Sequence, residues 1–73
     1  MNAEQRKRVS EAITLIREGL SVFEEIAGEE DEKASNLPDN LSSKADEYEE
    51  KASLLRNAYE TIEDELSTIE SEL

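Results

Sequence analysis

The sequence of 73 residues has no cysteine and no histidine, and only one proline and two glycines. Without cysteine the chain forms no disulfide and no thiolate metal site. Without histidine it lacks the commonest metal ligand and the commonest general base. Chains below roughly 70–80 residues rarely bury a sufficient core unless a disulfide, a metal or a second subunit helps. Of these three aids, oligomerisation is the one that suits this sequence.

Long apolar runs and positive charge are also scarce. The uninterrupted apolar runs are pairs such as Leu15-Ile16, so we expect no membrane-spanning segment. The basic residues near the N-terminus are not followed by the apolar stretch of a signal peptide, so we expect a cytoplasmic protein. Twenty acidic and eight basic side chains give a net charge of −12. This charge argues against direct binding of nucleic acid, and it suits either a basic protein partner or simple solubility.

Two segments carry apolar residues at alternating steps of three and four, the pattern of a coiled-coil seam. In the first segment these residues are Val9, Ile13, Ile16, Leu20, Phe23 and Ala27. In the second they are Leu41, Ala45, Tyr48, Ala52, Leu55, Tyr59, Ile62, Leu66, Ile69 and Leu73. The pattern predicts an all-α protein with a single domain over residues 1–73. We expect a helix over about 2–34, a connector over about 35–42 and a helix over about 43–73.

The connector SNLPDNLS contains the only proline of the chain. Because Pro38 cannot continue the first helix, a short break between two seams predicts an antiparallel two-helix hairpin. Asn36 is expected to cap a short turn within the connector. Ser43 and Asp46 have the spacing of a capping box for the second helix.

One antiparallel register pairs six seam positions of the first helix with six of the second. It sets Phe23 against Ala52 and Ala27 against Tyr48, which places large side chains opposite small ones. The same register places the basic cluster, Arg6 to Arg8, beside acids of the second helix. These acids are Glu63, Asp64, Glu65, Glu70 and Glu72.

The first helix also carries apolar residues that the seam does not use. Because such a stripe is wider than one helix can cover, we expect a homodimer that forms a four-helix bundle. The expected contact is antiparallel about Gly19, which allows close approach of the two backbones. The expected interface residues are Ala12, Leu15, Gly19, Val22, Ile26, Leu54 and Ala58.

No group of side chains in the sequence suits catalysis, a cofactor or a metal. The acidic run, Glu29 to Glu32, points in successive directions around a helix, so its carboxylates cannot converge on one ion. The serines and threonines have no activating base. Tyr48 and Tyr59 fall on the seam, where we expect core packing. We therefore expect a binding protein without enzymatic activity, cofactor or metal.

The segment Asn36-Leu37-Pro38-x-x-Leu41, set between two acidic amphipathic helices, resembles the connector of a group of small uncharacterised proteins from tailed phages and prophages. The likeness covers nearly the full length, including a basic and then apolar first helix and a Glu-rich second helix. It implies a phage setting and action in the host cytoplasm. For proteins of this kind it also implies binding and disabling of a host protein, often a defence component.

The acidic run and the connector fall at the same end of the predicted hairpin. We expect this end to dock on a basic groove of an unidentified host protein and to block it. The expected contact residues are Glu29, Glu30, Glu32, Asn36, Leu37, Asp39, Asp46 and Glu47. Two other functions fit the sequence, namely a structural or scaffolding coiled coil and an acidic mimic of DNA. An acidic surface that only confers solubility is a further alternative.

Overall fold

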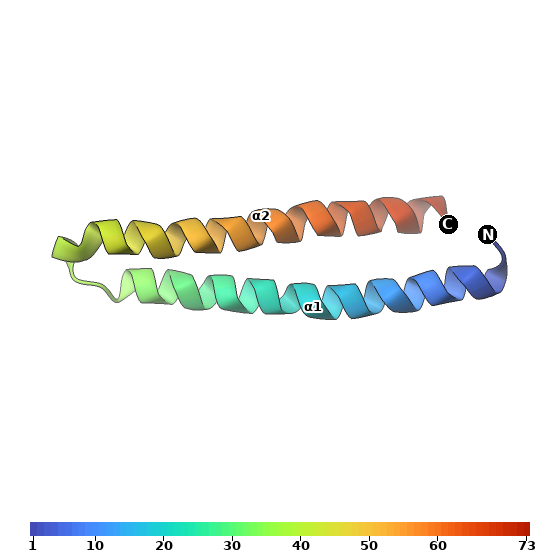
Figure 1. The fold of residues 1–73 in the computed structure, drawn as a ribbon, viewed down its shortest axis with the longest axis horizontal. Coiled ribbons are helices and arrows are strands. Elements are labelled where there is room, and N and C mark those ends of the chain that lie inside the picture. Colours follow the sequence, from blue (N-terminus) through green and yellow to red (C-terminus); the bar gives the residue numbers. More distant parts are fainter.

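A computed structural model describes residues 1–73 of the chain. It consists of helix α1 (Ala3–Ser35), a one-turn 3-10 helix η1 (Asp39–Leu41) and helix α2 (Ser42–Glu72). The two long helices lie side by side in antiparallel order and are joined at one end through η1 (Figure 1). The molecule is a rod of 59 × 16 × 11 Å. The prediction of an all-α helical hairpin is confirmed.

The first turn of α1 is held by a reciprocal capping box. The side chain of Asn2 accepts a hydrogen bond of 2.8 Å from the backbone N–H of Gln5. In return, the Gln5 side chain accepts one of 3.1 Å from the backbone N–H of Asn2. Both bonds satisfy N–H groups that a helix terminus otherwise leaves free. The local polar spacing therefore determines where α1 begins.

The role predicted for Asn36 is wrong. Asn36 does not open a turn but ends α1 as its C-cap residue, and its backbone N–H donates to the carbonyl of Glu32 at 3.1 Å. The helix continues to this point because the proline lies two residues further on. Pro38 instead precedes η1, which the backbone N–H of Leu41 closes on the Pro38 carbonyl at 2.9 Å.

The capping box predicted for α2 is also absent. The helix begins at Ser42, directly after η1, and no side chain forms a hydrogen bond at its start. Ser43 therefore lies inside the first turn, where its side chain cannot act as a cap for Asp46 or its neighbours. The 3-10 turn leads into the helix and replaces the expected cap.

The core is a single narrow seam between the helices. Only six of the 73 residues are buried, and all six are apolar: Ile13, Leu20, Ala27, Ala34, Ala52 and Leu66. The four on α1 recur every seven residues, so each helix presents one line of side chains to the other. The main cluster joins Ile13, Leu20 and Leu66. Four half-buried side chains pack against it: Val9, Phe23, Tyr59 and Ile62.

The register of the two helices differs from the predicted one, as the position of Arg17 shows. Its guanidinium lies 2.9 Å from Glu63 and 2.6 Å from Glu70. In the predicted register Arg17 would be level with Ala58, and Glu70 would lie about 18 Å further along the axis. Two side chains cannot bridge that distance. Because Arg17 lies between Glu63 and Glu70, the helices are displaced by about seven residues, or roughly two turns.

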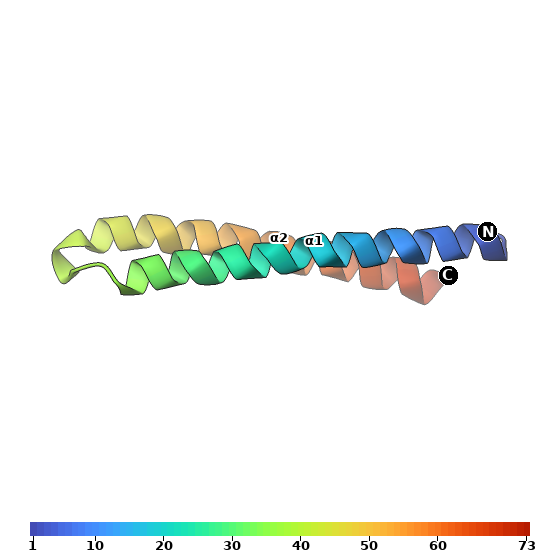
Figure 2. The same cartoon turned by 90° about the horizontal axis from the view of Figure 1, so that it is seen from below.

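The displaced register sets core residues opposite one another. Phe23 becomes level with Tyr59, and both pack against the buried cluster. The predicted layers, with Phe23 level with Ala52 and Ala27 level with Tyr48, are therefore wrong by about two turns. The displacement is visible at the open end of the hairpin, where α1 projects beyond the last turn of α2 in two views (Figures 1 and 2). Neither helix combines the length and the apolar character required to cross a bilayer.

Candidate protein-binding surfaces

One flank of the seam is closed by ion pairs between the helices, and we call it the ion-paired flank. Arg17 donates hydrogen bonds to Glu63 and Glu70, the shortest of them 2.6 Å long. Further along, Arg56 lies 2.7 Å from Asp31. Arg17 and Asp31 are fourteen residues apart on α1, and Arg56, Glu63 and Glu70 follow one another at steps of seven on α2. The paired residues of each helix therefore share one face.

The ion pairs shift the pKa values of their members. The hydrogen bond to Glu70, together with that to Glu63, raises the pKa of Arg17 above its usual high value. The same bond lowers the pKa of Glu70 below the ordinary carboxyl range. Within α1, a hydrogen bond of 2.8 Å to Glu30 raises the pKa of Lys33. Because these groups are accessible to solvent and salt, they align the helices more than they stabilise them.

The opposite flank exposes apolar side chains of both helices. Leu15 is 68% exposed, Leu54 65% and Val22 50%. Ile16, predicted as a seam residue, is 44% exposed, because a single neighbouring helix covers only one of the two seam lines fully. We define the apolar flank by the residues Ala12, Leu15, Ile16, Gly19, Val22, Ile26, Leu54, Leu55, Ala58 and Ile62. Of the seven residues predicted for a dimer interface, six are exposed in the hairpin and Ala58 is half-buried.

Along α1 the apolar flank is bounded by charge. We define the second row as the residues that continue its spacing of alternating threes and fours: Arg8, Ala12, Leu15, Gly19, Val22, Ile26, Glu29 and Lys33. The five central residues are uncharged, and they are bounded by Arg8 at one end and by Glu29, followed by Lys33, at the other. The second row therefore repeats the spacing of the core seam on a face that the hairpin does not cover.

The basic cluster, Arg6 to Arg8, forms no ion pair within the chain. The predicted pairing of this cluster with acids of α2 is therefore wrong. In the displaced register the first turns of α1 project beyond the last turn of α2 (Figure 1). Arg17, and not the cluster, therefore binds the carboxylates of Glu63 and Glu70.

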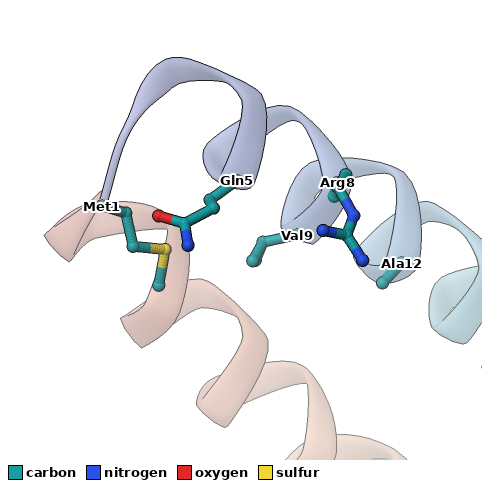
Figure 3. Close-up of a pocket in the computed structure, with 5 residues that line it drawn as sticks. All are labelled: Met1, Gln5, Arg8, Val9 and Ala12. Carbon is teal, nitrogen blue, oxygen red and sulfur yellow. The ribbon is translucent and has the colours of Figure 1, made fainter.

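An open hollow lies at the same end of the molecule. It is lined by Met1, Gln5, Arg8, Val9 and Ala12, whose side chains extend from one side of the first turns of α1 (Figure 3). The last four of these are spaced like the four residues that surround one hole in knobs-into-holes packing. The hollow therefore has the shape that receives a side chain from a neighbouring helix.

The predicted partner-binding residues gather at the connector end of the rod (Figure 1). Six of them are exposed: Glu29, Glu32, Asn36, Asp39, Asp46 and Glu47. Glu30 and Leu37 are half-buried. The end is not purely acidic, because Lys33 and Lys44 lie 5.7 and 5.9 Å from the centre of the Tyr48 ring. These cation–π contacts are a feature that the sequence pattern did not indicate.

The carboxylates of the chain form no group of three or more that could hold a metal ion. Comparison with known proteins matched no family model, no curated protein and no solved structure. Function is therefore inferred from the apolar flank and the acidic connector end.

Proposed function

We propose that the chain is a non-enzymatic protein-binding module and that it acts as a homodimer in which two hairpins form a four-helix bundle. The observation that carries this proposal is the exposure of the apolar flank, where Leu15 and Leu54 are each about two-thirds exposed. Contiguous apolar surface of this kind on a small protein is typical of a protein–protein contact. The hairpin buries only six residues, so a second copy supplies the missing core.

The accessible area supports a second subunit of standard size. The chain exposes 5483 Å². A compact monomer of 8.2 kDa exposes roughly 4500 Å² by the usual scaling with mass. The difference of roughly 1000 Å² is comparable to the ~800 Å² that each partner contributes to a standard interface. Dimerisation would therefore bring the exposed area of each chain into the usual range.

The dimer is proposed to act on another protein through its acidic connector end. The net charge is −12, and Glu32, Asp39 and Asp46 are exposed there. Such a surface favours fast, salt-sensitive association with a basic groove, which it would block without chemistry. In the phage setting that the Asn36-Leu37-Pro38 connector indicates by resemblance, the blocked molecule is a host protein such as a defence component.

The dimer is tested by the mass of the chain in solution. Light scattering at micromolar concentration should give twice 8.2 kDa. Val22→Glu should give the monomer, because it places a charge in the apolar contact. Ser21→Glu, which adds the same charge one residue away from the second row, should leave the dimer intact. A monomeric mass for the unaltered chain at this concentration would refute the homodimer.

The role of the acidic end is tested by charge reversal. An affinity pull-down from host lysate should retain one stoichiometric partner. Reversal of Glu32, Asp39 and Asp46 to lysine should abolish its retention. The matched control reverses three exposed glutamates elsewhere on α1, namely Glu11, Glu18 and Glu25. Equal loss of the partner in both triple variants would show that only the overall charge matters and would remove the connector end from the mechanism.

A further inference from the structure

We infer that the second copy docks antiparallel along the second row of α1, so that Arg8 of each chain pairs with Glu29 of the other. The inference rests on the proposed dimer and adds, to the antiparallel contact about Gly19 that the sequence predicts, the charge pairs that fix its orientation. Gly19 is the middle residue of α1, which spans Ala3–Ser35. An antiparallel contact centred there overlaps the complete length of the helix and buries the most surface.

The second row is complementary to itself in antiparallel order. With Gly19 opposite Gly19 of the second copy, Leu15 lies opposite Val22 and Ala12 lies opposite Ile26. Each layer then combines a larger with a smaller side chain, which favours close packing. Apart from its chain neighbours and the adjacent backbone of its own helix, no heavy atom lies within 4 Å of the place where a Cβ on Gly19 would be. The chain's own packing therefore does not require glycine there, whereas close approach of a second helix does.

The charges at the ends of the second row select the orientation. In the antiparallel arrangement Arg8 lies opposite Glu29 of the second copy, and the two-fold axis forms this pair twice. In the parallel arrangement Arg8 would face Arg8 and Glu29 would face Glu29. Because like charges in contact oppose association, the row disfavours the parallel dimer.

The hollow at the free end of α1 matches this register (Figure 3). Glu29 of the second copy is level with it, so that its methylene groups lie on Val9 and Ala12 and its carboxylate accepts from Arg8. Neither Arg8 nor Glu29 forms an ion pair within its own chain. Both charges are therefore available to the second copy.

The same arrangement brings together two larger groups of opposite charge. The basic cluster, Arg6 to Arg8, comes beside the acidic run, Glu29 to Glu32, of the second copy. Within one chain these groups lie at opposite ends of α1. A second copy in antiparallel order thus gives the basic cluster the carboxylate neighbours that the hairpin does not.

A charge swap tests the pairing. At low ionic strength Arg8→Glu should weaken the dimer roughly ten-fold, because it replaces two attractive pairs with two repulsive ones. Glu29→Arg should weaken it similarly. The double variant R8E/E29R should restore the dissociation constant to within about two-fold, since opposite charges again face each other. Lys7→Glu is the matched control, because it changes the same charge off the second row.

Disulfide cross-linking gives an independent test, since the chain has no cysteine of its own. In the antiparallel register a chain with Leu15→Cys should cross-link to a chain with Val22→Cys after the two are refolded together. Leu15→Cys alone should not cross-link, because the two positions lie about 10 Å apart along the axis, beyond the ~7 Å limit for Cα atoms. A parallel dimer gives the reverse pattern.

The outcomes separate the inference from the proposed function. A monomeric unaltered chain overturns both. A stable dimer in which R8E has no effect, in which K7E is equally harmful, or in which Leu15→Cys cross-links to itself overturns the antiparallel register and leaves the dimer standing. Rescue by the double variant together with the mixed disulfide supports the inference.

Discussion

Arg17 and Glu70 are joined by two hydrogen bonds, of 2.6 and 2.9 Å, between opposite helices of the hairpin. A bidentate pair of this kind has a defined geometry, because the planar guanidinium matches the carboxylate. The pair therefore specifies how the two helices are aligned along their length. It also closes one flank of the seam and leaves the apolar flank free for another molecule.

Replacement of Arg17 should loosen the alignment of the helices. We expect Arg17→Lys to lower the melting temperature slightly, because a lysine cannot reproduce the bidentate contact with Glu70 and the bond to Glu63. The difference from the unaltered chain should vanish at high salt, which screens exposed pairs. Thermal unfolding followed by circular dichroism measures both effects, and a salt-independent loss would indicate that the side chain acts through packing instead.

The Arg17–Glu70 pair also predicts a pH dependence. The hydrogen bond lowers the pKa of Glu70 in the folded chain. A carboxyl group with a lowered folded pKa stabilises the fold above its unfolded pKa of about 4.3 and loses this effect as the pH falls through the folded value. The melting temperatures of the unaltered chain and of Glu70→Gln should therefore differ most near neutral pH and converge in acid. A difference that grows as the pH falls below about 4 would contradict the pairing.

The fully buried alanines should not accept larger side chains. Ala27→Leu is expected to cost roughly 1–3 kcal/mol in the free energy of unfolding, because Ala27 and Ala52 are both 0% exposed and leave no space between the helices. Ala3→Leu, at an exposed position at the start of α1, is the control and should be close to neutral. Chemical unfolding of both variants measures the difference.

The two glycines of α1 should respond differently to substitution by alanine. Gly28→Ala should stabilise the chain by about 0.5–1 kcal/mol, since its site is open and its backbone is helical. Gly19→Ala should raise the helical propensity equally but weaken the dimer, because the added methyl group separates the two backbones. Unfolding and light scattering on the same samples measure the two effects. An unaltered dimer affinity for Gly19→Ala would show that the interface does not pass through Gly19.

Several features of the surfaces followed from the sequence, and others did not. The apolar residues of α1 beyond the seam, such as Leu15 and Val22, could be recognised because helical periodicity alone assigns them to a different face. The exposure of Ile16 could not, because periodicity places it on the seam and does not show how far one neighbour reaches. The contacts of Lys33 and Lys44 with the Tyr48 ring depend on how the helices meet at the connector. No local spacing encodes that geometry.

The periodicity of the sequence is sufficient to predict a helical hairpin. The alternating steps of three and four define two seams, and Pro38 ends the first helix within a short connector, so only an antiparallel pair can bury both seams. The axial register of the two helices, in contrast, is set by tertiary contacts. The seam repeats every seven residues, so alignments that differ by seven residues, or about two turns, bury similar apolar area. The choice among them depends on contacts between distant residues, namely the packing of Phe23 and Tyr59 on the buried cluster and the reach of Arg17 to Glu70.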